Sequence, residues 1–213
     1  MRHHYRTNRA FTLIELLTVI AIIALLAALL FPAIKGAMLK AEVSKAQTGA
    51  VGLAIAFKAY YTEYGTWPVT VTDLSLSNQT FIVDSNMVAL LQGMNNTASL
   101  TGANASGALI GGVGLSALQG NARGIRFHEF KAADLGGSPA CPGCFLDPWK
   151  QPYFCRFDVS SANNVADPFT GNGVPLVNVN AGFLVWSAGP DGQFDDKGDV
   201  PPSPANKDNV KTW

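Results

Sequence analysis

The sequence is poor in charge and in cysteine. Only 14% of its 213 residues are Asp, Glu, Lys or Arg, and acidic and basic residues balance at 15 each. It contains no basic stripe of the kind that nucleic-acid-binding proteins present to phosphates, so we expect no nucleic acid as a partner. Three cysteines are too few for a domain built on disulfides. Apolar residues make up 48% of the chain and are concentrated in its first sixty positions.

The longest apolar stretch runs from Phe11 to Phe31 and contains one charge, Glu15. As a helix, a stretch of this length spans about 30 Å, which is the thickness of the hydrocarbon core of a bilayer. The basic leader keeps the N-terminus in the cytoplasm by the positive-inside rule; its arginines are Arg2, Arg6 and Arg9. The sequence therefore predicts a single-pass membrane protein whose C-terminal domain lies on the far side of the membrane.

Glu15 needs an explanation, because an acid in hydrocarbon is unfavourable by several kcal/mol. No Lys or Arg lies between Phe11 and Ile34 to neutralise it. A secretory signal has a small-residue cleavage site after its apolar run, whereas here the small residue Ala10 precedes the run. Cleavage after Ala10 would leave a free amine on Phe11, which could neutralise Glu15 of the same chain or of an axially offset neighbouring copy. The alternative is a plain anchor with its acid in the wetter membrane edge.

Residues 10–17, with the sequence AFTLIELL, resemble the processing site of type IV pilins and of the pseudopilins of type II secretion. The resemblance implies that a prepilin peptidase cuts between Ala10 and Phe11 and methylates the new amine. It also implies that Glu15 is required for subunit assembly. The family usually has Gly before the cut, where this chain has Ala10.

An amphipathic helix is predicted to continue the apolar one over residues 32–66. Its apolar residues alternate spacings of four and three along one stripe: Leu39, Val43, Ala46, Ala50, Leu53, Phe57, Tyr60 and Tyr64. Gly65 to Pro68 should end it. Pro32 should kink or locally melt the rod, either as a device for filament packing, which the resemblance implies, or as a simple kink at the membrane exit.

Residues 67–145 form a variable region with few signals. Asp84 and Ser85 should cap a short helix over 86–91, and the Gly-, Ala-, Ser- and Asn-rich stretch 93–124 reads as a long surface loop. The weak alternation over 125–130 is compatible with a strand. His128 beside Glu129 is interpreted as structural rather than catalytic, because a lone histidine on a strand rarely acts alone.

The C-terminal part, residues 146–213, predicts a small antiparallel sheet with strands over 153–159, 176–179 and 182–187. In the first of these, Tyr153, Cys155 and Phe157 share one face and Phe154 lies on the other. One apolar face of the sheet can cover the 39–64 stripe. The predicted fold class is therefore α+β, a long N-terminal helix packed on a small antiparallel sheet.

Acidic residues cluster among glycines in the C-terminal loop, where oxygen ligands would suit Ca²⁺ although the spacing is not that of an EF-hand. The motifs around 147–153 and 189–192, with the terminal Asp208-x-Val-x-x-Trp213, resemble the major pseudopilin of type II secretion, whose C-terminal loop binds a structural calcium. Carried over to this chain, the implied ligands are Asp191, Asp195, Asp196 and Asp208. Lys150 replaces a usual glycine, and Asn209 replaces the second acid of a usual pair.

The three cysteines lie within fifteen residues and suggest one local disulfide outside the cytoplasm. We expect Cys155 to pair with Cys144, or otherwise with Cys141. Cys141 and Cys144 form a C-x-x-C motif, but the thioredoxin-like context of a redox site is missing. A zinc site would need a fourth ligand, and only His128 is near in sequence.

The predicted function is that of a structural subunit, not an enzyme, since no Ser/His/Asp or paired-carboxylate constellation is present. We expect a type II secretion pseudopilin anchored in a bacterial inner membrane, with its C-terminal domain and filament in the periplasm. Its partners would be the bilayer, copies of itself, minor pseudopilins, the prepilin peptidase and the inner-membrane assembly platform. The alternatives are a subunit of a type IV pilus or competence filament and, from another class, a membrane-tethered enzyme or thiol oxidoreductase.

Overall fold

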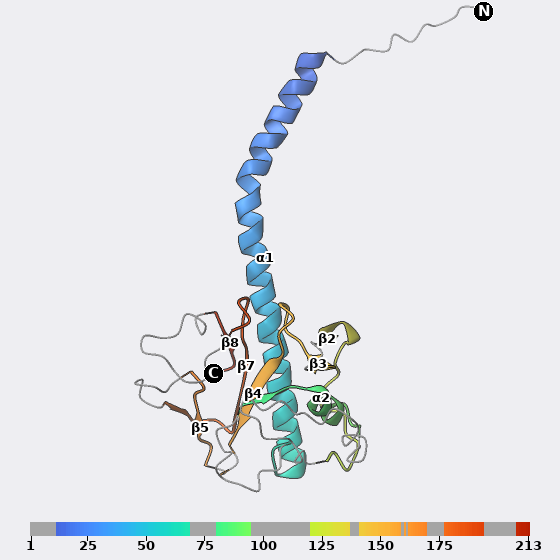
Figure 1. Ribbon diagram of the computed structural model, residues 1–213, viewed down its shortest axis with the longest axis vertical. Helices are drawn as coiled ribbons and strands as arrows, with labels where there is room; N and C mark the ends of the chain where they lie inside the picture. The colour runs from blue at the N-terminus through green and yellow to red at the C-terminus, as the bar shows by residue number, and fades with distance from the viewer. Residues whose placement is uncertain are drawn as a thin grey trace, which may run out of the picture. The chain divides into compact units, whose positions relative to one another are not determined.

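The computed structural model describes residues 12–68, 80–94, 120–136, 141–158, 160, 162–169, 177–193 and 208–213, with only the backbone of residues 32 and 33. Contacts divide the chain into two units, Met1–Ala41 and Glu42–Trp213. We call the second unit the head. Figure 1 shows the chain coloured from blue at the N-terminus to red at the C-terminus.

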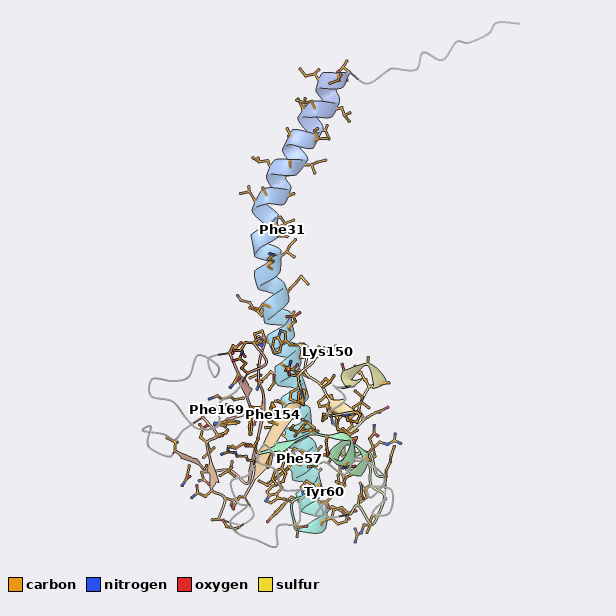
Figure 2. All side chains as sticks on the ribbon, in the orientation of Figure 1. Phe31, Phe57, Tyr60, Lys150, Phe154 and Phe169 are labelled. Carbon is orange, nitrogen blue, oxygen red and sulfur yellow. A yellow bond between two sulfur atoms is a disulfide. The ribbon has the colours of Figure 1, made fainter. Side chains whose placement is uncertain are left out.

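The first unit is the beginning of a single long helix, α1 (Leu13–Tyr64). Its apolar side chains, from Leu13 to Phe31, are exposed on every side of the helix (Figure 2). By length and composition this part of α1 can cross a membrane. The helix runs through Pro32 without a break, and the kink expected there stays a prediction.

The second part of α1 supplies the centre of the head core. The predicted stripe is fully buried at Ala46, Ala50, Leu53, Phe57 and Tyr60, and Figure 2 shows Phe57 and Tyr60 among the side chains of the head. Leu39 and Val43, earlier on the stripe, are 46% and 39% exposed.

The end of α1 follows from the glycine after Tyr64. Gly65 has a φ of 70°, which lies in the left-handed region that suits glycine at a helix C-terminus. Its N–H donates to the Tyr61 carbonyl at 2.8 Å. The predicted helix end is confirmed.

The main sheet has four antiparallel strands in the order β1 (Phe81–Ile82), β4 (Tyr153–Phe157), β7 (Phe183–Ser187) and β8 (Val210–Lys211). Both of its faces are buried. Tyr153, Cys155 and Phe157 belong to the cluster that contains the α1 stripe, whereas Phe154 packs in a second cluster with Trp186. The predicted division of the strand into two faces is confirmed.

Aromatic rings join the sheet to the helix. The rings of Phe57 and Phe157 meet edge to face at 4.9 Å between centroids, and the Tyr153 hydroxyl donates to the Ala46 carbonyl at 3.0 Å. Each fully buried large side chain of this kind contributes about 1.5–3 kcal/mol relative to exposure. Burial also raises the pKa of Tyr60 to about 12, so its hydroxyl stays neutral.

The smaller elements complete the head. Helix α2 (Ser85–Leu91) begins at the predicted cap, with the Asp84 side chain accepting from the N–H groups of Asn86 and Met87. A 3₁₀ turn, η2 (Ala132–Asp134), leads into β2 (Leu135–Gly136), which pairs with β3 (Cys144–Phe145). β5 (Val165–Ala166) pairs with β6 (Asn178–Val179).

Two predicted strands differ from the structure. Residues 125–130 form no strand, because the N–H groups of Phe127 and His128 both donate to the Leu91 carbonyl at the end of α2. The segment predicted at 176–179 pairs with β5 and not with the main sheet. The predicted α+β class, a long N-terminal helix with antiparallel sheets after it, is confirmed.

Candidate functional sites at the helix start and in the C-terminal loops

Glu15 lies in a capping box at the start of α1. Its Oε2 accepts hydrogen bonds from the Thr12 backbone N–H and from the Thr12 hydroxyl, each at 2.8 Å. The Glu15 N–H in turn donates to the Thr12 hydroxyl at 3.3 Å. This reciprocal Thr-x-x-Glu arrangement satisfies backbone donors that a helix start leaves without partners.

Through the capping box, Glu15 has a hydrogen-bonding partner, Thr12, in its own chain, which a search for a neutralising positive charge does not reveal. The Thr-x-x-Glu spacing was visible in the sequence and would have identified it. Ala10 and Phe11, where processing is predicted, lie outside the described residues. A carboxylate has about four acceptor positions, so Glu15 can keep the contact with Thr12 and still accept from an amine.

The loop that follows β3 is organised by a buried carboxylate, Asp147. Its Oδ1 accepts from the N–H groups of Trp149 at 3.0 Å and Gln151 at 2.8 Å, and its Oδ2 accepts from the Ser187 hydroxyl at 2.6 Å. Burial raises the pKa of Asp147, against the opposing effect of these hydrogen bonds. The Trp149 indole N–H donates to Glu42 of α1 at 3.0 Å, so the loop is tied to the helix.

Lys150, labelled in Figure 2, adopts a φ of 68° within this loop. The left-handed region is easy for glycine and unfavourable for residues with a β-carbon. The geometry explains why a glycine suits this position in the family that the sequence resembles.

The acidic C-terminal loop begins where β7 ends. The Gly189 N–H donates to the Ser187 hydroxyl at 3.1 Å, and Gly189 has a φ of 74°. A side chain on Gly189 would collide with the Asp208 carbonyl, so glycine is needed for this close approach. The Asp191 N–H donates to Asp208 Oδ2 at 3.3 Å.

The backbone of Asp191 therefore contacts the carboxylate of Asp208, so two of the four predicted calcium-ligand residues are neighbours. Asp195 and Asp196 lie outside the described residues. The other oxygen of Asp208, Oδ1, is buried and accepts no hydrogen bond from the described residues. An orphaned buried carboxylate oxygen fits a cation ligand. The described residues hold no group of three or more His, Cys, Asp or Glu side chains arranged around one point.

The cysteine pairing differs from the prediction. Cys141 forms a disulfide with Cys144, and Cys155 is a buried free thiol, so the expected Cys144–Cys155 bridge is wrong. The reason is that Cys155 sits at the centre of the sheet, paired with Phe81 and Val185 on the neighbouring strands. Burial, with a smaller effect from Asp84, raises the pKa of the Cys155 thiol and keeps it protonated.

His128 packs as a half-buried ring in the head. Its ring centroid lies 4.5 Å from that of Phe130 and 6.1 Å from that of Phe145, and its edge rests on Gly52. The ring lines a cavity of about 310 Å³. Burial lowers the pKa of His128. These contacts agree with the structural interpretation of this histidine.

A long apolar helix with a capped glutamate at its start, continuing into a small antiparallel head, defines the pilin-like class of proteins. The prokaryotic N-terminal methylation motif matches residues 5–31. The N-terminal part of this chain is similar to type IV pilins.

Similar curated proteins are named as fimbrial proteins and type IV major pilins. The fimbrial protein of Neisseria meningitidis serogroup A is 40% identical over 75 residues, 35% of this chain and 44% of that protein. The type IV major pilin protein PilE1 of Neisseria gonorrhoeae is 33% identical over 94 residues, 44% of this chain and 57% of that protein. The fimbrial protein EcpC of Eikenella corrodens is 41% identical over 63 residues, 30% of this chain and 41% of that protein.

The matches thus span about half the length of these relatives. No solved structure matches the chain.

Proposed function

We propose that the chain is a structural filament subunit, made as a membrane-anchored precursor and assembled into a type II secretion pseudopilus. The observation that carries this proposal is Glu15, held at the start of an apolar helix inside the matched methylation motif. A prepilin peptidase cuts between Ala10 and Phe11 and methylates the Phe11 amine. The chain is not an enzyme in this proposal; its work is mechanical.

Assembly is favoured because a charged carboxylate is unfavourable in free energy within lipid. In the bilayer, before assembly, Thr12 supplies two hydrogen bonds to Glu15, which lowers that cost without removing the charge. In the filament the Phe11 amine of the next subunit approaches the same carboxylate and neutralises it. The ion pair is favourable only at one axial offset between subunits, and it therefore sets the register.

The partners follow from this cycle. The basic leader keeps the N-terminus cytoplasmic and the head periplasmic, in an inner membrane. Copies of the chain and minor pseudopilins form the filament on an inner-membrane assembly platform, and growth of the filament moves cargo outward.

Substitution at Glu15 tests the proposal. We expect Glu15→Ala to be cleaved and inserted normally but to form no filaments when it is produced with its peptidase and assembly proteins. Thr18→Val is the matched control, because it removes a hydroxyl one turn further on whose hydrogen bond, within the described part of the chain, goes to the Glu15 carbonyl. Electron microscopy of sheared filaments reads the result, and filaments of Glu15→Ala at the wild-type level would refute the assembly role.

A surface pilus is the second candidate, supported by relatives named as fimbrial proteins and type IV major pilins. The pseudopilus is supported by the joining of the 147–151 loop, the 189–192 turn and Asp208 into one cluster. Production of the chain in cells that carry only a secretion platform, or only a pilus platform, distinguishes the two by which platform polymerises it.

We also propose that the head binds a structural Ca²⁺ in the C-terminal loop. Asp208 and Asp191 would hold it, with Asp195 and Asp196 as further ligands. The ion would neutralise the carboxylates of the loop. It would also coordinate the buried Oδ1 atom of Asp208, which accepts no hydrogen bond from the described residues. Calcium titration of the detergent-solubilised chain tests this, and Asp208→Asn should bind at least tenfold more weakly.

A further inference from the structure

A continuous chain of contacts leads away from Asp208 through the head. In the turn that carries Asp191, the backbone of Gly189 lies against the backbone carbonyl of Asp208, too close for a side chain on Gly189 to fit. The Gly189 N–H then donates to the Ser187 hydroxyl, and that hydroxyl donates to Asp147. Ser187 is fully buried, so no water competes for these two bonds.

A second contact joins the same two loops. The Gly192 backbone lies against the Gln151 side chain, and a β-carbon there would come within 2.9 Å of Gln151 Nε2. Gln151 is itself fixed, because its N–H donates to Asp147. The acidic turn and the 147–151 loop therefore meet at both of their ends.

The 147–151 loop reaches α1 directly. Asp147 orients Trp149 through the Trp149 backbone N–H, and the Trp149 indole donates to Glu42, the first residue of the head. Each link is a hydrogen bond or a close backbone approach with one preferred geometry. A shift of the acidic turn must consequently be transmitted to Ser187 and Asp147 or break a buried bond.

We propose that the 147–151 loop couples the cation site at Asp208 to helix α1, with Ser187 as a positioning residue. Calcium binding and the Trp149–Glu42 hydrogen bond then strengthen each other. This inference rests on the calcium site of the proposed function. Because coupling between two equilibria is reciprocal, calcium strengthens the Trp149–Glu42 contact by the same factor by which that contact strengthens calcium binding, so removing the contact should weaken calcium binding.

The test is calcium affinity, measured by calorimetry on the full detergent-solubilised chain. Trp149→Phe keeps an aromatic ring and removes the indole donor, and Glu42→Ala removes the acceptor from the opposite side. We expect each to weaken calcium binding about fivefold. Ser187→Ala should weaken it about tenfold, as loss of a group that orients a ligand usually does.

Tyr64→Phe is the matched control. It also deletes hydrogen bonds between α1 and the rest of the head, one from the Tyr64 hydroxyl to Asn121 and one from the Arg123 N–H to that hydroxyl, but far along the helix from Glu42. Its calcium affinity should equal that of the wild type. Hydrogen exchange gives a readout that a loss of stability would not produce: calcium should slow exchange near Ala46 in the wild type and not in Trp149→Phe.

The outcomes separate the two proposals. A wild-type chain that binds calcium, with Trp149→Phe and Glu42→Ala weakened and Tyr64→Phe unchanged, supports the coupling. A wild-type chain that binds, with all variants equal to it, or with Tyr64→Phe weakened as much as the others, overturns the coupling alone. A wild-type chain that binds no calcium overturns the calcium site and the coupling together.

Discussion

Lys150 holds a backbone conformation that its own side chain disfavours. Its φ of 68° is forced by the tight loop around Asp147, whose carboxylate binds the N–H groups on both sides of it. Lys150→Gly should raise the free energy of unfolding by about 1 kcal/mol, because glycine adopts this region without strain.

Urea unfolding of the full chain in detergent measures this effect as a higher midpoint with an unchanged slope. Lys150→Ala retains the β-carbon and should match the wild type. A gain in Lys150→Ala as large as that in Lys150→Gly would assign the effect to the lost charge and not to the backbone.

His128 gives the head a dependence on acid. Burial lowers its pKa from the ordinary value of 6.5, so below that pH the unfolded chain binds more protons at this residue than the folded chain does. Stability is therefore fully present above pH 6.5 and is lost as the pH falls through the pKa of the folded state. In His128→Gln the unfolding free energy should vary less between pH 7 and pH 5, measured by urea unfolding. An unchanged pH dependence would contradict this account.

At the scale of elements, the buried side-chain amide of Asn121 connects three segments that are not paired with one another in a sheet. Its side chain donates to the carbonyls of Leu90 and Ile125 and accepts from the Tyr64 hydroxyl and the Ile125 N–H. The ends of α1 and α2 are thereby fixed to the turn at residues 120–125.

Asn121→Ala should lower the free energy of unfolding by about 3 kcal/mol, since several buried partners lose their bonds at once. Asn86→Ala is the control. Asn86 is a half-buried asparagine whose side chain makes one long bond to Asp84, at 3.4 Å, and its loss should lower stability by roughly 0.5 kcal/mol. Equal losses in the two variants would show that Asn121 does not hold the segments together.

The cysteine pairing is a second feature at this scale. Because Cys155 is buried between two strands and Cys141 is bonded to Cys144, only one thiol should be available. Alkylation of the unreduced, denatured chain should label Cys155 alone, and peptide mapping should recover residues 141–144 as a bridged peptide. Label on Cys141 or Cys144 would contradict the pairing in the structure.

Elements with local signals could be predicted, and the others could not. Gly65 ends α1 and Asp84 caps α2 through contacts within a few residues, which the sequence displays. β1 and β8 are two residues long and exist only because β4 and β7 offer free edges. Residues 125–130 have a strand-like alternation, but the N–H groups of Phe127 and His128 donate to the Leu91 carbonyl and not to a neighbouring strand.

At the scale of the whole molecule, the candidate sites could likewise be predicted only where their contacts are local in the sequence. The Thr12–Glu15 pair could have been predicted, because the capping box is a local pattern. The cluster around Asp147, Ser187 and Asp208 joins segments about 20 to 60 residues apart, and no spacing within the chain places them together. The resemblance to pseudopilins points to these segments, but it does not indicate that they lie in contact with one another.

The measurement that tests the central claim most directly is the intact mass and N-terminal sequence of the membrane-extracted chain, made with and without its prepilin peptidase. The account predicts a mature chain that begins at a methylated Phe11 and appears only when the peptidase is present. A chain that keeps residues 1–10 in the presence of an active peptidase would contradict it. The apolar helix would then be a plain anchor, with Glu15 held by Thr12 alone.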